Sequence, residues 1–239
     1  MGPIGVVEKL VKYLPRNIFS DFDKSNITPV SSAPYGSASI LAISYSYISM
    51  MGGAALKKAT ELSILNANYI RSRLQDHYQV LYKGINGTSA HEFIIDCRDF
   101  KSDTDIEVED IAKRLMDYGY HAPTVSFPVP GTMMIEPTES ETKAELDKFC
   151  DVMIEIRNEI EEIRNGTYDK VNNVLKNAPH TASVVTASSW VFPYTREKAA
   201  YPLDIVSSNK FWPSVGRVDN AHGDRNLFCS CIPLEEYSS

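Results

Sequence analysis

The order of helical and strand-like segments between residues 54 and 165 constrains the fold more than any other feature of this sequence. Apolar residues recur every three or four positions, the spacing of a buried helical face, over 54–78, 104–118 and 138–163. Short apolar runs typical of strands occupy 79–83, 92–97 and 132–136. This order predicts an α/β chain with a small α+β domain, in which helices cover one face of an antiparallel sheet.

Each predicted helix carries a face that we expect to be buried. The three faces are Leu56, Ala59, Ser63, Ala67, Ile70 and Leu74; Val108, Ile111, Leu115 and Tyr118; and Leu146, Phe149, Met153, Ile156, Ile160 and Ile163. Capping boxes are predicted at Thr104–Glu107 and at Thr138–Glu141, and Gly119 stands where a glycine commonly follows a helix. The turn at 84–87 predicts a β-hairpin between the first two strands.

The two ends of the chain differ in character from this middle part. Residues 1–14 predict a short amphipathic helix, and residues 40–51 an apolar helix that Gly52 and Gly53 interrupt. After residue 166 prolines recur and periodicity fades, although both tryptophans lie there. We therefore expect connecting helices over 1–53, the small domain over 54–165, and over 166–239 an irregular tail that packs its aromatic residues on a surface.

Composition excludes several classes of function. The net charge of −7 and the pI near 5.3 argue against nucleic acid or an anionic membrane as the main partner, and no apolar stretch approaches the length of a membrane span. Cys97 and Cys150 read as small buried side chains, whereas the Cys229/Cys231 pair suggests redox regulation. The five scattered histidines predict no metal site and are interpreted as surface or structural residues.

Three stretches deserve a functional interpretation beside a structural one. Ser32–Ser39 (SAPYGSAS) combines hydroxyls and backbone amides before a helix, which suits a phosphate, but composition alone favours an ordinary serine N-cap with a tight turn. The proline-rich loop after Tyr120 exposes His121 and Thr124 near a strand end, where α/β folds assemble sites. Arg196 suits a carboxylate ligand, but a surface ion pair with Glu197 or another acid is the favoured interpretation.

These stretches together resemble the carboxy-terminal region of the glycine decarboxylase family, the pyridoxal-phosphate-dependent P-proteins of the glycine cleavage system. The resemblance covers essentially the whole chain. It is carried by MGPIGV at Met1, SAPYGSASIL at Ser32, MMGGAALKKATELSILNANYI at Met50, AHEFIID at Ala90, AKRLMDYGYHAPTVSFPVPGTMMIEPTESE at Ala112, KAELDKFCD at Lys143, PYTREKAAYP at Pro193, and the NKFWP and CSC elements near the end.

The resemblance implies the carboxy-terminal lobe of a type I pyridoxal-phosphate-dependent transferase fold. The intact enzyme would decarboxylate glycine, with the cofactor as electron sink, and pass the aminomethyl group to the lipoyl arm of the H-protein. A homodimer is implied, in the mitochondrial matrix for a eukaryotic protein and in the cytoplasm for a bacterial one.

Within this family context, site residues are inferred from the backbone chemistry of these stretches and from their expected proximity. Tyr35, Gly36 and Ser37 are expected near the cofactor phosphate, with Tyr35 standing where relatives usually have tryptophan. His121 and Thr124 are expected near the substrate entrance. The cofactor lysine is expected before Met1, because the contexts of Lys57, Lys58 and Lys83 do not match, so no catalytic residue is assigned here and this segment is expected to be inactive alone. A non-catalytic module that binds the full-length enzyme or the H-protein is the alternative; a lobe of an ordinary aminotransferase is a third interpretation.

Overall fold

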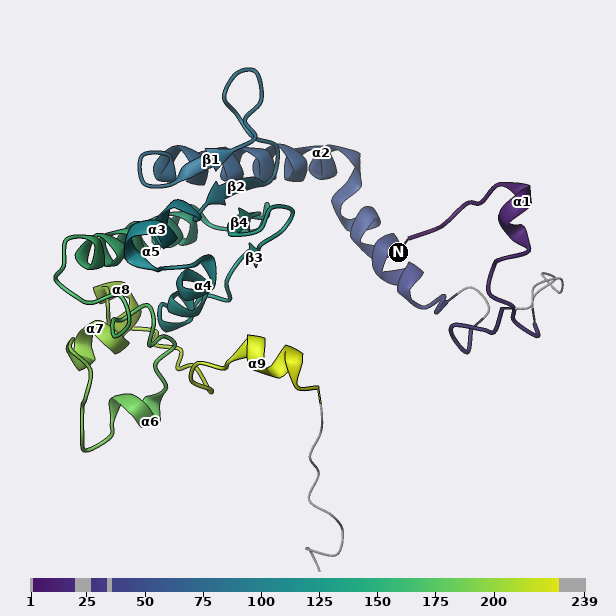
Figure 1. The fold of residues 1–239 in the computed structure, drawn as a ribbon. Helices are drawn as coiled ribbons and strands as arrows, with labels where there is room; N and C mark the ends of the chain where they lie inside the picture. Colours follow the sequence, from purple (N-terminus) through teal and green to yellow (C-terminus); the bar gives the residue numbers. More distant parts are fainter. Residues whose placement is uncertain (1, 20–26, 34–35, 228–239) are drawn as a thin grey trace, which may run out of the picture. The chain divides into compact units, whose positions relative to one another are not determined.

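The computed structural model describes residues 2–19, 27–33 and 36–227 (Figure 1). The chain divides into two compact units, Met1–Glu61 and Leu62–Ser239, and each is considered by itself below.

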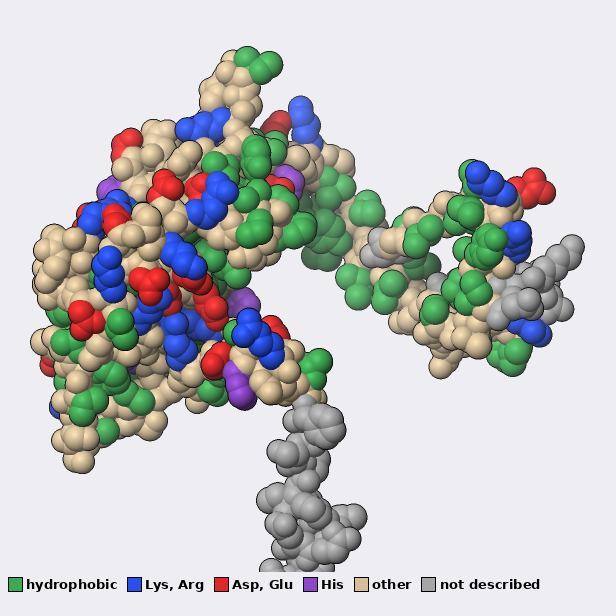
Figure 2. All heavy atoms as spheres, viewed as in Figure 1, with side chains coloured by type: hydrophobic (Ala, Val, Ile, Leu, Met, Phe, Trp, Pro, Cys, Tyr) green, Lys and Arg blue, Asp and Glu red, His purple; other side chains and the backbone are tan. Residues whose placement is uncertain are grey.

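The first unit contains little buried surface. Its short helix α1 spans only Glu8–Val11 and buries no residue, so the helix predicted over residues 1–14 is wrong in its extent. Two glycines and a proline precede it, and glycine and proline are the poorest helix formers. Large hydrophobic side chains are exposed along the unit, as Figure 2 shows; those most exposed are Ile4, Ile18, Phe19, Val30, Ile43, Tyr45 and Met50.

Helix α2, Ile40–Leu74, begins in the first unit and ends in the second. Gly52 interrupts it with a φ of 63° and a ψ of 173°, which confirms the predicted break, because only glycine adopts that backbone conformation without steric cost. In the second unit the predicted face is confirmed where it enters the core, at Ala67, Ile70 and Leu74.

The second unit is built on a four-stranded antiparallel sheet in the order β1-β2-β4-β3. Its strands are β1 (Gln79–Leu81), β2 (Phe93–Asp96), β3 (Thr124–Val125) and β4 (Thr132–Ile135). The hairpin between β1 and β2 confirms the prediction, with Val80 opposite Ile95. Every residue of β2 is buried, so both faces of this central strand are covered.

Three helices pack with this sheet: α3 (Asp99–Thr104), α4 (Val108–Asp117) and α5 (Lys143–Arg164). The buried stripes predicted for α4 and α5 are confirmed from Val108 to Tyr118 and from Leu146 to Ile163. These stripes, the strands and the end of α2 form one hydrophobic core.

Both predicted capping boxes are wrong in position. Thr104 is the last residue of α3, which we did not predict, and its hydroxyl donates to the carbonyl of Phe100. Helix α4 begins after Glu107, whose amide donates to the Asp110 carboxylate at 2.9 Å. Helix α5 is capped by Thr142, whose Oγ1 accepts from the amide of Glu145 at 3.2 Å. Acidic and hydroxyl residues crowd both helix starts, so several local cap registers satisfy the pattern.

The described part of the tail belongs to the second unit, packs on its core and contains four short helices. They are α6 (Ala182–Val185), α7 (Arg196–Ala200), α8 (Asp204–Ser207) and α9 (Asn220–Arg225). Val174, Leu175 and Tyr194 join the core, while Trp190 and Phe192 pack against it. Tyr194, Trp190 and Phe192 therefore cover a surface of this same chain, whereas Phe211 is exposed.

The predictions about cysteines and membrane spans can be compared with the structure only for the described residues. Cys97 and Cys150 are buried free thiols, as predicted, and burial raises the pKa of Cys97 to about 12. Cys229 and Cys231 lie outside the described residues. Within the described ranges, no helix combines the length and apolarity that crossing a membrane would require.

Candidate functional site

A cavity of about 580 Å³ lies in the second unit, between the segment that follows α4, the end of β4 and the first turns of α5. Its walls are mostly apolar, and carboxylates and one histidine are placed among them. The lining residues are Ile70, Tyr120, His121, Ala122, Pro123, Thr124, Met134, Ile135, Glu136, Pro137, Glu141, Glu145, Leu146 and Phe149. An apolar cavity with a few convergent polar groups is the usual form of a small-molecule site.

The turn that ends α4 places the segment carrying His121 against this cavity. Gly119 has a φ of 85°, its amide donates to the carbonyl of Met116 at 3.0 Å, and the amide of Tyr120 donates to that of Leu115 at 3.0 Å. This pair of bonds is a Schellman motif, which reverses the chain after a helix. The predicted role of Gly119 is thereby confirmed.

Antiparallel pairing then positions Thr124. Thr124 pairs with Met134 and Val125 with Met133, so β3 runs beside β4 at the edge of the sheet. His121 and Thr124, both predicted from the sequence as substrate-proximal residues, line the same cavity and are exposed. Their proximity to a substrate remains a prediction.

Tyr120 and Glu145 form the most constrained polar pair of the cavity. The Tyr120 hydroxyl donates to Glu145 Oε1 at 2.7 Å, and the ring meets Phe149 edge-on with centroids 5.4 Å apart. Burial, and then the hydrogen bond to Glu145, raises the pKa of Tyr120 above its ordinary value. Lys148 Nζ lies 3.7 Å from Glu145 Oε1, so this carboxylate has an ion-pair contact beside the hydrogen bond from Tyr120.

Glu136 joins the cavity to a small surface cluster. His91 Nε2 lies 3.7 Å from Glu136 Oε1 and 4.0 Å from Glu92 Oε2, and each residue offers one potential ligand atom for a metal. The β2–β4 register brings the two glutamates together, because Phe93 pairs with Ile135. His91 and Glu136 are exposed, and such groups commonly occur on surfaces without an ion, so we assign no metal here.

The predicted phosphate residues belong to the first unit. Tyr35 lies outside the described residues. Gly36 has a φ of 81°, and Ser37 Oγ lies 2.7 Å from Ser39 Oγ just before α2. Exposed hydroxyls before a helix start fit a phosphate in chemistry, so the donor set is compatible with pyridoxal phosphate. The amide of Ile40 donates to the Ser37 carbonyl, as in an ordinary helix start.

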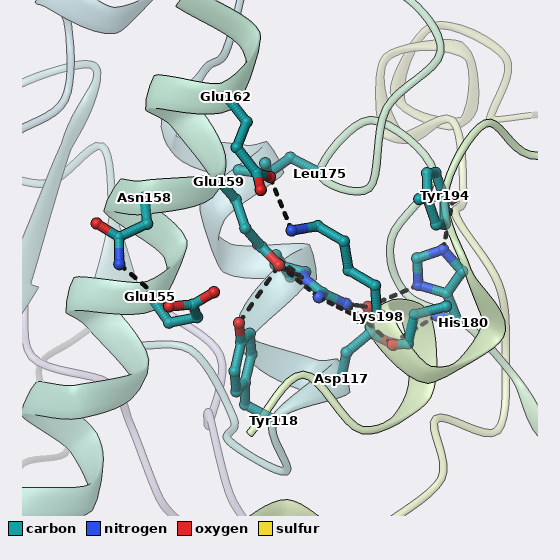
Figure 3. A network of polar contacts seen from close by, with 12 residues as sticks. Asp117, Tyr118, Glu155, Asn158, Glu159, Glu162, Leu175, His180, Tyr194 and Lys198 are labelled. Carbon is teal, nitrogen blue, oxygen red and sulfur yellow. Dashed lines mark hydrogen bonds and ion pairs between the residues drawn. The ribbon is translucent and has the colours of Figure 1, made fainter. Parts of the chain in front are cut away.

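A second constellation, which sequence reasoning missed, is a buried polar network that includes Asp117, Glu159 and His180 (Figure 3). Arg114 donates to Glu159 and to Asp117, Asp117 accepts from the His180 amide, and the His180 ring bridges Asp117 and the Tyr194 hydroxyl. All of these side chains are buried, so the network connects α4, α5 and the tail. Asp117 follows Arg114 by one helical turn, but Arg114, Glu159 and His180 lie far apart in the sequence, so no local pattern predicts that they meet.

The contacts of Arg196 are with a main-chain carbonyl and an aromatic ring rather than with a carboxylate of this chain, and its binding of a carboxylate ligand stays a prediction. Its Nη2 donates to the carbonyl of Ala187 at 2.7 Å, and its guanidinium lies 5.2 Å from the centroid of the Trp190 ring. Arg196 therefore ties the aromatic part of the tail together, through a main-chain hydrogen bond and a cation–π contact.

Comparison with known proteins supplies the family context. Residues 59–180 match the model of the family described as "Glycine dehydrogenase, C-terminal domain". The chain is similar to proteins named "Glycine dehydrogenase (decarboxylating)": it is 63% identical to one from Flavobacterium johnsoniae, 60% to one from Christiangramia forsetii and 56% to one from Nostoc punctiforme.

These alignments cover 99–100% of this chain but 25% of each relative, so the chain spans about a quarter of the length of these curated relatives. The three relatives are bacterial. The comparisons thus give no support to a mitochondrial matrix location or to an ordinary aminotransferase lobe.

Proposed function

Because the chain belongs to the glycine dehydrogenase family, whose carboxy-terminal domain it contains, we propose that it forms the carboxy-terminal part of an enzyme that decarboxylates glycine. The observation that carries this proposal is identity of 56–63% along the whole chain with proteins named for that activity. We further propose that the chain forms the carboxy-terminal lobe of a type I pyridoxal-phosphate-dependent transferase fold, in an enzyme that is a homodimer in the bacterial cytoplasm. Its domain boundaries would lie after residues 53 and 165.

The proposed cofactor is pyridoxal phosphate, which when bound serves as the electron sink for decarboxylation. Gly36 and Ser37, with Tyr35, would receive its phosphate. The Ser37 and Ser39 hydroxyls, 2.7 Å apart, supply suitable donors. We assign no cofactor lysine in this chain: Lys57 is exposed on α2 and pairs with Glu61 at 3.6 Å, as the solvated face of a helix does.

The cavity described above would lie near the bound substrate. His121 and Thr124 offer polar groups at its edge, and the apolar walls from Ile70, Leu146 and Phe149 exclude water from one side. In such an environment hydrogen bonds are stronger than in bulk water, so residues here orient a bound group effectively. The partners in this proposal are glycine and the lipoyl arm of the H-protein.

Release of labelled carbon dioxide from carboxyl-labelled glycine tests the proposal. The complete polypeptide that contains this segment is assayed with pyridoxal phosphate and lipoylated H-protein, beside H-protein that lacks the lipoyl group. We expect release with the first and not with the second, and none from the 239-residue chain alone. A complete, cofactor-loaded polypeptide that does not decarboxylate glycine would contradict the proposal, and binding of the chain to the H-protein without turnover would favour an interaction module.

A further inference from the structure

Lys210 has an unusual environment in the tail of the second unit. Its half-buried ammonium donates to the main-chain carbonyl of Asp117, with 2.5 Å between Nζ and O. The ring centroids of Trp212 and Tyr201 lie 5.0 Å and 6.0 Å from Nζ. Lys210 is therefore enclosed by one carbonyl and two aromatic rings.

Other lysines of this unit have carboxylate partners. Lys101 pairs with Glu107, Lys143 with Asp147 and Lys198 with Glu162, at 2.5–2.7 Å. Within the part of the chain that the structure describes, Lys210 forms no such ion pair. The carboxylate of the adjacent Asp117 is already engaged by Arg114 and His180.

This environment weakens the preference of Lys210 for its charged form. Partial desolvation of an ammonium that has no carboxylate partner favours the neutral amine. Burial lowers the pKa of Lys210 to about 8, against the opposing influence of Asp117. A substantial fraction of the side chain is then a neutral, nucleophilic amine at mildly alkaline pH.

We propose that Lys210 is a site of Nε-acylation by small donors with an activated carbonyl group. The surroundings also suit the product. An acylated lysine keeps one N–H, which can still donate to the Asp117 carbonyl, and the acyl group meets the rings of Trp212 and Tyr201. Acylation of Lys101, Lys143 or Lys198 would instead break an ion pair.

The reaction needs no oxidant or further cofactor. The amine lone pair attacks the acyl carbon and forms a C–N bond. The C–O bond of an acyl phosphate, or the C–S bond of a thioester, breaks and phosphate or thiolate leaves with the electron pair. The nitrogen loses one proton to solvent.

Acetylation of the purified chain tests this proposal. The chain is incubated at about pH 8 with acetyl phosphate, and separately with acetyl-coenzyme A, and the initial rate at each lysine is followed by peptide mass spectrometry. An amine of pKa near 10.4 is neutral in roughly one molecule of 250 at that pH. Because Lys210 is half-buried and so less accessible, we expect it to react only about tenfold faster than exposed Lys83. The donor that gives the faster reaction at Lys210, acetyl phosphate or acetyl-coenzyme A, identifies the donor class.

The dependence of the acetylation rate on pH distinguishes a more nucleophilic Lys210 amine from one that is only more accessible to the donor. The rate at Lys210 should level off above about pH 8, whereas that of an ordinary lysine keeps rising towards pH 10. K210R should remove the fast site and K83R should leave it. The main comparison is made within one unmodified chain, so it does not depend on how a variant folds. Equal rates at Lys210 and Lys83 with both donors, or a Lys210 profile that rises through pH 10, would overturn the proposal.

Discussion

Arg114 and Glu159 form a fully buried ion pair, with 2.6 Å between Arg114 Nη2 and Glu159 Oε1 and 3.0 Å between Nε and Oε2. Arg114 also donates to the carbonyls of Lys198 and Ala199 at 2.8 and 3.0 Å. One guanidinium thus joins α4, α5 and the tail helix α7. Because both side chains are withdrawn from water, each depends on the other for compensation of its charge.

Arg114→Met should therefore strongly destabilise the second unit. Removing one partner of a buried pair leaves an uncompensated charge, which costs about 3–5 kcal/mol. The measurement is denaturant unfolding followed by circular dichroism. The double variant R114M/E159M should recover part of the loss. The control K143A breaks a largely exposed pair with Asp147 and should change stability far less. Equal effects of R114M and K143A would refute the role given to Arg114.

Gly131→Ala should destabilise the turn before β4. Gly131 has a φ of 75°, and an added Cβ would lie 2.6 Å from Arg98 Cγ. The left-handed backbone alone costs roughly 1–2 kcal/mol for a non-glycine residue. Gly166→Ala is the matched control, since Gly166 has a φ of 83° and no atom within 4 Å of its added Cβ. We expect a larger loss of unfolding free energy at Gly131, and equal losses would show that Arg98 moves aside without cost.

Stability should depend on pH through Asp96. Hydrogen bonds from Arg98 hold the pKa of Asp96 below its ordinary value. A folded-state pKa below the unfolded value stabilises the fold above about pH 3.9, and this contribution is lost as the pH falls through the folded-state value. Arg98→Gln should therefore be less stable than the parent chain at pH 7, and the difference should shrink near pH 2.5.

Urea unfolding at several pH values measures this difference. Arg225→Gln is the control, because Arg225 lies on the exposed helix α9. If the difference in unfolding free energy between the R98Q and parent chains stays constant down to about pH 2.5, the effect of Arg98 comes from packing and not from the charge of Asp96.

Substitutions in the cavity should impair turnover of the complete enzyme. His121→Ala and Thr124→Val each remove a polar group from the cavity edge. We expect kcat/KM for glycine to fall by about tenfold or more, which corresponds to a loss of about 1.4 kcal/mol of transition-state stabilisation. His222→Ala, on exposed α9, is the control. Unchanged kinetics in both cavity variants would remove His121 and Thr124 from the proposed site.

The isolated chain should self-associate through its first unit. Ile43, Tyr45 and Met50 are 71%, 75% and 86% exposed on the first part of α2, and surfaces of this kind favour association. Light scattering should show mass that rises with concentration, and the triple variant I43S/Y45S/M50S should reduce it. The triple variant I85S/K83S/T88S, on the β1–β2 connection, serves as the control. A monomer at all concentrations would contradict this expectation.

The sequence by itself determined the elements whose pattern is local. Four features were of this kind: the buried stripes of α4 and α5, the break at Gly52, the β1–β2 hairpin and the glycine after α4. Each depends on backbone geometry over a few residues, so it appears in the sequence as a regular spacing of apolar residues or as a glycine. His121 and Thr124 line one cavity because one short segment carries both, and their role at a substrate stays a prediction.

Only the tertiary structure decided which of several neighbouring polar residues capped each helix, and which distant charges met. Thr142 prevailed over Thr138, and Glu107 over Thr104, because packing sets where a helix begins. Arg114, Glu159 and His180 are far apart in the chain, and burial of the faces that carry them brings them together. Such pairing depends on how elements meet in space, which no local period encodes.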